Sequence, residues 1–277
     1  MEDRIISGSA PVGVFDSGIG GLTVVREIMR QIPNEKIIYF GDTARVPYGS
    51  KSKKTVTRYS KQILRFLQSH HVKTVVVACN TASACALEDL ENETDLPIIG
   101  VVKPGAKVAV EVTRNGRIGV IGTEATIKSQ IYARYITELK KEVTIYGKAC
   151  PLFTPLVEEG LWEDPVTDEI ARRYLNELID IDIDTLVLGC THYPLIRSTL
   201  GRIVGENVRL VNPAYETARA LKELLAQKGL LNQEKHTLGA GQYEFYVSDM
   251  ADKFRVFANS IIKHGILSAK TVNIEDF

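Results

Sequence analysis

The sequence lacks an excess of charge of either sign, because 34 lysines and arginines balance 34 aspartates and glutamates. It therefore gives no electrostatic reason to expect nucleic acid or an anionic membrane surface as a main partner. It also lacks any apolar run long enough to span a bilayer, and residues 1–10 carry Glu2, Asp3 and Arg4 instead of the apolar stretch of a secretory signal. We expect a cytoplasmic protein without membrane association.

Cysteine is scarce, with four residues at positions 79, 85, 150 and 190. No pair has the CxxC spacing of common zinc and redox motifs, so we expect neither a metal nor a disulfide. A chain of 277 residues can bury a sufficient core without covalent links. If these thiols have a role, we therefore expect them to act as thiolates in a reaction and not as structural cross-links.

Short β-branched runs alternate with longer stretches of helical period, which predicts an α/β fold with mainly parallel sheets covered by helices. Between residues 56 and 67, apolar residues recur at spacings of three and four, as on the inner face of a helix. Further helices are predicted at 81–90, after Asn212-Pro213 and at 250–263. The predicted strands are Val12–Phe15, Ile37–Phe40, Thr74–Ala78, Ile98–Val102, Arg117–Ile121, Thr185–Leu188 and Tyr243–Val247.

The chain contains a weak internal repeat. Residues 12–17 (VGVFDS) resemble residues 118–123 (IGVIGT), and each segment is followed, after a similar interval, by a strand that ends in a cysteine, Cys79 or Cys190. Two α/β halves of common design explain this pattern. We predict a boundary between the halves near Pro97, and periodicity leaves open whether the segment after Asn212-Pro213 belongs to the second half or returns to the first.

Cys79 and Cys190 each follow a strand and precede a helix, where ligands bind in open parallel sheets. A helix N-terminus favours anions, so we expect a thiol there to ionise more readily than a free one. A single buried cysteine is more often a packing residue, which is our interpretation of Cys85 and Cys150. Cys79 and Cys190 occupy equivalent positions in the two halves, which favours a catalytic role for this pair.

Other strand-end loops carry polar groups. Asp16 opens a glycine-rich turn that lacks the dinucleotide-binding spacing, and it is suited to pairing with an ammonium group or orienting a proton donor. The turn Pro47-Tyr48-Gly49 can present backbone groups to a carboxylate, although it is also an ordinary turn. His192, two residues after Cys190, is suited to a proton relay, although such a histidine is often structural.

Four segments in order resemble the glutamate racemase family of bacterial cell-wall synthesis: residues 15–22 (FDSGIGGL), 41–49 (GDTARVPYG), 78–82 (ACNTA) and 189–194 (GCTHYP). The similarity extends from about Val12 to the last helix. It implies a cofactor-independent interconversion of L- and D-glutamate that supplies D-glutamate for peptidoglycan. It also implies two similar three-layer domains with the active site in the cleft between them, the first formed by residues 1–97 and the returning segment 213–277 and the second by residues 98–212. We also expect a homodimer.

The resemblance implies that Cys79 and Cys190 are the catalytic thiols, assisted by Asp16, His192 and Glu158, with Glu159 as an alternative to Glu158. By the same analogy, Cys79 acts on D-glutamate and Cys190 on L-glutamate. Only about ten residues precede the first strand, so activation through an N-terminal extension is not expected. The predicted substrate-binding residues are Asp16, Ser17, Pro47, Tyr48, Gly49, Asn80, Thr81, Thr123, Thr191 and His192.

Inverting an α-carbon requires one base and one acid on opposite faces, which two thiols on opposite walls of a cleft can supply. Three alternatives stay open. A related racemase could act on aspartate or a hydantoin. A single cysteine with His192 could form a nucleophilic hydrolase or acyltransferase, which would leave the second thiol idle. A non-catalytic amino-acid-binding module would also use a cleft between two α/β halves.

Overall fold

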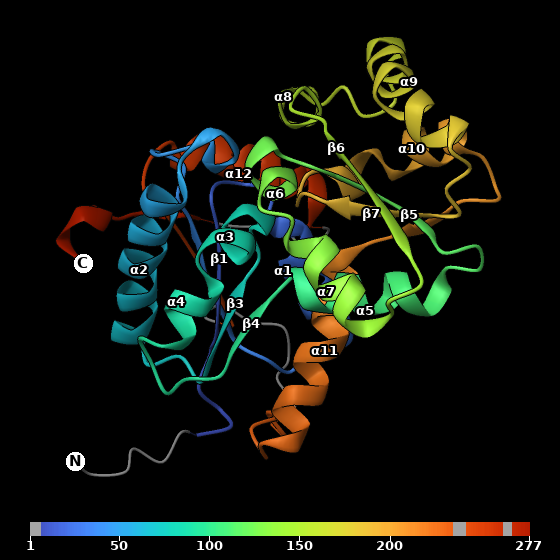
Figure 1. Cartoon of the computed structure of the whole chain (residues 1–277). Coiled ribbons are helices and arrows are strands. Elements are labelled where there is room, and N and C mark those ends of the chain that lie inside the picture. The colour runs from blue at the N-terminus through green and yellow to red at the C-terminus, as the bar shows by residue number, and fades with distance from the viewer. Residues whose placement is uncertain (1–6, 235–241, 263–267) are drawn as a thin grey trace.

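A computed structural model describes residues 7–234, 242–262 and 268–277. It contains two parallel sheets that lie side by side (Figure 1). The first has the strand order β10-β9-β2-β1-β3-β4, and the second has the order β6-β5-β7-β8. The strands are β1 (Val12–Asp16), β2 (Ile37–Gly41), β3 (Thr74–Val77), β4 (Ile98–Gly100), β5 (Arg117–Gly122), β6 (Thr144–Ala149), β7 (Thr185–Gly189), β8 (Arg209–Val211), β9 (Tyr243–Val247) and β10 (Lys270–Thr271).

The two sheets share one topology. The order β2-β1-β3-β4 in the first matches β6-β5-β7-β8 in the second, so β1 corresponds to β5 and β3 to β7. This is the correspondence that the internal repeat predicts, and the α/β class with two similar halves is confirmed. Both cysteines of interest follow the strand next to the first strand of their half.

Helices cover both faces of each sheet. Val12 and Val14 of β1 contribute to one apolar cluster with α1, whereas Phe15 belongs to the cluster on the opposite face with α2. This alternation follows from the period of two along a strand. The helices are α1 (Leu22–Gln31), α2 (Lys53–Ser69), α3 (Asn80–Cys85), α4 (Leu87–Glu91), α5 (Val102–Val112), α6 (Glu124–Lys128), α7 (Ile131–Leu139), α8 (Phe153–Glu158), α9 (Pro165–Asp180), α10 (Arg197–Val204), α11 (Pro213–Gln227) and α12 (Ala251–Ile261), with the 3-10 turns η1 (Tyr48–Ser50), η2 (Tyr193–Ile196) and η3 (Ile274–Asp276).

Helix α11 joins the two halves, because it packs against α1 of the first and α5 of the second (Figure 1). Its start follows local rules: the Asn212 side chain accepts a hydrogen bond from the Ala214 amide at 3.1 Å, and Pro213 occupies the first turn. After it, β9 pairs with β2 of the first sheet. The predicted domain boundaries stay a prediction, although β4 at 98–100 pairs within the first sheet.

Three predicted elements differ in extent. The strand predicted at 98–102 ends at Gly100, because α5 begins at Val102 and accommodates Pro104 in its first turn. The helix predicted at 81–90 is broken at Ala86 into α3 and α4. The predicted last helix begins after Met250, which is left-handed, and residue 263 lies outside the described part of the chain.

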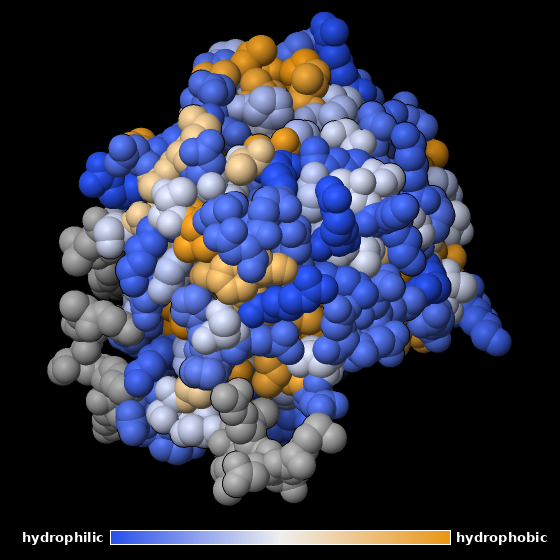
Figure 2. Space-filling view, turned by 90° about the vertical axis from the view of Figure 1, so that its left-hand side faces the viewer, coloured by the Kyte–Doolittle hydropathy of each residue, from blue (hydrophilic) through white to orange (hydrophobic). Residues whose placement is uncertain are grey.

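The face shown in Figure 2 is mostly hydrophilic, with apolar residues in small groups. In the part of the chain that the structure describes, no helix has both the length and the apolar character needed to cross a bilayer.

Candidate active site

The carboxyl ends of β3 and β7 face a common cavity of about 60 Å³ between the two halves. Ligands bind at this edge of open parallel sheets. All the predicted site residues except Asp16 line it. The lining consists of Ser17, Gly18, Val46, Pro47, Tyr48, Gly49, Cys79, Asn80, Thr81, Thr123, Thr154, Glu158, Cys190, Thr191 and His192.

Cys79 is 5% exposed at the start of α3. Its Sγ lies 3.5 Å from Ser17 Oγ and accepts a hydrogen bond from the Ala82 amide at 3.4 Å. Burial and the nearby charge of Asp16 nevertheless raise the pKa of Cys79 to about 12. The expectation that this thiol ionises readily is therefore wrong, because desolvation outweighs the hydrogen bonds of a six-residue helix.

Cys190 lies in a different environment. Its Sγ is 3.7 Å from His192 Nδ1 and 3.9 Å from Thr154 Oγ1. On the far side of the imidazole, His192 Nε2 lies 3.1 Å from Glu158 Oε1. The imidazole of His192 therefore lies between the thiol of Cys190 and the carboxylate of Glu158.

The contacts with Cys190 and Glu158 also determine the charge of His192. Burial lowers the pKa of His192, but the hydrogen bonds with Cys190 and Glu158, together with the charges of Cys190 and Asp16, raise it to about 10. The hydrogen bond with His192 in turn lowers the pKa of Glu158. An imidazolium ion is therefore the stable form of His192 at neutral pH, and its positive charge lies beside the Cys190 sulfur.

Asp16 lies behind the cavity wall and is fully buried. Its carboxylate accepts hydrogen bonds from the Gly18 amide at 3.0 Å and from Thr191 Oγ1 at 3.4 Å. Burial raises the pKa of Asp16, although the charge of His192 and these hydrogen bonds oppose the shift. Asp16 can therefore act on a substrate only through its neighbours in this arrangement.

Hydrogen bonds connect the two halves around the cavity. Thr81 Oγ1 lies 2.9 Å from Thr123 Oγ1, and Tyr132 of α7 donates to Asn80 Oδ1 at 2.7 Å. Gly20 lies against the second half so closely that an added Cβ would be 2.5 Å from the His192 ring. The relative position of the two thiols is thus set by contacts beside each of them.

Tyr48 is buried, and its hydroxyl donates a hydrogen bond to Asp42. The hydroxyl proton is therefore already donated to Asp42, and the backbone amides of Tyr48 and Gly49 remain as the donors that this loop can present. Glu159 is exposed and absent from the lining, whereas Glu158 contacts His192. Of the two glutamates, only Glu158 lies in the site.

The sequence interpretation missed Thr154, Gly18 and Val46. Thr154 precedes Glu158 by four positions, so the two side chains share one face of α8. That spacing is the signal that would have found it. The described residues contain no group of three or more His, Cys, Asp or Glu side chains placed to hold a metal ion.

We compared the chain with known protein families, and its sequence matches one of them. The sequence profile described as Asp/Glu/Hydantoin racemase matches residues 12–221, and the chain belongs to this family. Among its relatives, the glutamate racemase of Geobacter metallireducens is 49% identical over 264 residues, covering 95% of this chain and 97% of the relative.

Solved structures show the same similarity. A glutamate racemase isoform from Bacillus anthracis superposes with a TM-score of 0.91 at 39% identity, covering 95% of this chain and 97% of that one. Glutamate racemase from Francisella tularensis in complex with D-glutamate gives a TM-score of 0.90 at 36% identity, covering 98% and 100%.

Proposed function

We propose that this protein interconverts L- and D-glutamate by a two-thiol mechanism in which Cys79 and Cys190 face opposite sides of the α-carbon. The carrying observation is that two cysteines, at equivalent strand ends of two similar halves, line one cavity. The names of the relatives support glutamate as the substrate.

In the L-to-D direction, the Cys190 thiolate takes the α-proton and becomes a thiol. The Cα–H electron pair stays on the substrate as a carbanion. Cys79 then donates its S–H proton to the opposite face and becomes a thiolate. The high pKa of Cys79 suits it to hold that proton until the carbanion forms. In the reverse direction the two thiols exchange roles.

The carbanion needs electrostatic stabilisation, because the α-proton of an amino acid is only weakly acidic. The hydroxyls of Ser17, Thr81, Thr123 and Thr191, with the amide of Asn80, line the cavity and can hydrogen-bond the α-carboxylate. The backbone amides of Tyr48 and Gly49 are a second set of donors. In so narrow a cavity, few water molecules compete with these contacts.

His192 and Asp16 assist opposite thiols. His192, held by Glu158, stabilises negative charge on Cys190 at 3.7 Å. Asp16, whose pKa burial raises, acts on the ammonium group and on the proton of Cys79 through the intervening Ser17 turn. Glu158 is the auxiliary carboxylate of this scheme, and Pro47 shapes the loop.

We also propose the setting that the family implies: a cytoplasmic homodimer that supplies D-glutamate for peptidoglycan, without a cofactor. We propose residues 1–97 with 213–277, and residues 98–212, as its two domains, with residues 98–100 contributing β4 to the first sheet.

The test incubates the protein with L- or D-glutamate in D2O and no added cofactor. Racemisation with deuterium entering the α-position is expected, and Cys79→Ala and Cys190→Ala should each abolish it. Full turnover after either substitution would exclude the two-thiol mechanism. Racemisation of aspartate alone would support another racemase, and a covalent acyl-enzyme in intact mass spectra would support a hydrolase. Saturable binding without loss of optical rotation would support a binding module.

A further inference from the structure

The loop that lines the cavity at residues 46–49 is held from behind by a chain of polar contacts. Its first member is the hydrogen bond from the Tyr48 hydroxyl to Asp42 Oδ2. Asp42 follows β2 and is fully buried. The position of Tyr48, and of the backbone beside it, therefore depends on how Asp42 is held.

Asp42 is held mainly by Arg45. Arg45 Nε lies 3.0 and 2.8 Å from the two Asp42 oxygens, and Ser248 Oγ donates to Oδ1 at 2.9 Å. A carboxylate has about four lone-pair sites, so these donors and Tyr48 occupy it fully. Rotation of Arg45 would leave a buried carboxylate short of partners, which is strongly unfavourable.

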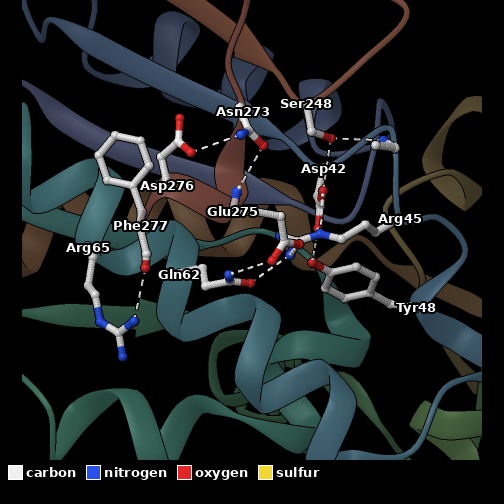
Figure 3. Close-up of polar contacts among 11 residues, drawn as sticks. Asp42, Arg45, Tyr48, Gln62, Arg65, Ser248, Asn273, Glu275, Asp276 and Phe277 are labelled. Carbon is white, nitrogen blue, oxygen red and sulfur yellow. Dashed lines mark hydrogen bonds and ion pairs between the residues drawn. The ribbon is translucent and has the colours of Figure 1, made fainter.

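Arg45 is fixed in turn by residues far along the chain. Its Nη1 donates to Gln62 Oε1 at 2.6 Å and to Glu275 Oε1 at 2.9 Å, and its guanidinium lies 4.0 Å over the ring of Tyr59. Figure 3 shows Arg45 between Asp42 and Glu275, with Tyr48 beyond Asp42. Glu275 is thus the second carboxylate that contacts the partly buried Arg45.

Glu275 belongs to a docked segment, residues 273–277, which we call the tail segment. Arg65 of α2 donates to the Phe277 carbonyl at 3.0 Å, and the Phe277 ring packs edge-on against Phe66 at 5.3 Å. Gln62 Nε2 also donates to Glu275 Oε2 at 3.1 Å. Helix α2 therefore presents the tail segment to Arg45 (Figure 3).

We propose that Glu275 is a positioning residue for the substrate loop: through Arg45 and Asp42 it sets the orientation of Tyr48 and of the backbone at residues 47–49. It does not touch the cavity. Its role in turnover rests on the proposed function, since these backbone groups are assigned there to the substrate carboxylate. The structural link from the tail segment to the loop is inferred from the contacts alone and does not depend on the proposed function.

Amide hydrogen exchange tests the link without substrate. In Glu275→Ala, we expect exchange of peptides covering residues 43–50 to rise about two- to fivefold, the range for a largely exposed ion pair. Asp276→Ala is the matched control, because Asp276 lies in the same turn and bonds Asn273 but not Arg45. Equal exchange in the wild type and Glu275→Ala, or an equal rise in both variants, would overturn the proposal.

Steady-state kinetics test the consequence for the site. Glu275→Ala should raise KM for glutamate about two- to fivefold with kcat nearly unchanged, and Glu275→Gln should restore part of the loss because it keeps an acceptor. A lower kcat with an unchanged KM would indicate partial unfolding and contradict the positioning role.

A double-substitution cycle checks the route. Because Tyr48→Phe removes the hydroxyl that reaches Asp42, adding Glu275→Ala should then raise KM little further. Full additivity would exclude the route through Asp42. Absence of racemisation in the wild-type protein would refute the proposed function, whereas the exchange experiment would still decide the link.

Discussion

The ends of β3 and β7 occupy the same place in two sheets of one topology, yet they surround their cysteines differently. After Cys79 come Asn80 and Thr81, and the nearby acid is Asp16 at the end of β1. After Cys190 come Thr191 and His192. The repeat thus preserved the position of the thiol while its neighbours diverged.

The divergence is electrostatic. An acid beside Cys79 opposes a second negative charge and holds a proton on that thiol. Beside Cys190 lies the imidazolium ion of His192, which places a positive charge next to that sulfur. The two halves therefore place charges of opposite sign beside equivalent thiols, and the proposed division into proton donor and proton acceptor rests on this difference.

The largest expected effect comes from removing one thiol. Cys79→Ser and Cys190→Ser should each reduce racemisation about 10²- to 10⁴-fold, the usual contribution of an acid or base. Each variant should still exchange the α-proton of one enantiomer with D2O: D-glutamate in Cys190→Ser and L-glutamate in Cys79→Ser. Proton NMR of each enantiomer measures this.

Cys85→Ser is the control, because Cys85 borders a separate cavity. It should retain full turnover. If both enantiomers exchanged equally in either single-thiol variant, the division of labour between the thiols would be wrong.

A bulkier residue at Gly20 should disturb the Cys190 side selectively. In Gly20→Ala, the new Cβ would lie 2.5 Å from His192 Cε1 and Thr191 Oγ1, so these groups must move. A displacement of this kind typically costs about 100-fold in rate. Gly201→Ala is the matched control, since its Cβ would meet only Leu210 at 3.6 Å. Comparable kcat values for the two variants would contradict the prediction.

The alkaline limb of the pH profile should depend on Glu158. The His192 imidazolium exists below its pKa of about 10 and is lost as the pH rises through that value, so kcat/KM should fall above it. Glu158→Gln removes a contribution that raises this pKa, and the limb should move down by about one pH unit. Glu159→Gln should leave the profile unchanged, and an equal shift in both variants would argue against Glu158.

The smallest effect concerns two buried tyrosines. Tyr132 donates across the halves to Asn80 at 2.7 Å, whereas Tyr193 donates to the Cys150 carbonyl at 2.8 Å within the second half. Loss of one hydrogen bond corresponds to a change of about two- to tenfold in a rate or equilibrium constant. Tyr132→Phe should lower kcat/KM by that factor, and Tyr193→Phe should lower Tm with little effect on kinetics. The reverse pattern would show that Asn80 needs no support from α7.

Sequence periodicity predicted the elements that build the sheets because each strand is short, apolar and followed by polar strand-end residues. β1 and β3 agree with the predicted strands to within one residue. It missed β6, β8 and β10, each of which lies at an edge of its sheet. The burial of β6 is mixed, and its sequence contains Gly147 and Lys148. Local pattern is weak where a strand lies at the edge of its sheet.

The site residues were predictable from motifs, but their electrostatics were not. A helix start after Cys79 is visible in the sequence, whereas the six-residue length of α3 and the buried carboxylate of Asp16 behind it are tertiary facts. Thr154 and Glu275 escaped notice because they follow β6 and β10, two edge strands that the sequence pattern did not reveal.

The unequal surroundings of the two thiols meet a thermodynamic constraint. L- and D-glutamate have equal free energies in an achiral solvent, so the equilibrium constant of their interconversion is one. For a racemase acting on them, kcat/KM must then be equal for the two enantiomers at every pH and in every variant. The asymmetry between Cys79 and Cys190 can appear only as differences in kcat that are matched by equal differences in KM. These differences reflect how long each enantiomer stays bound and which protonation state the free protein adopts.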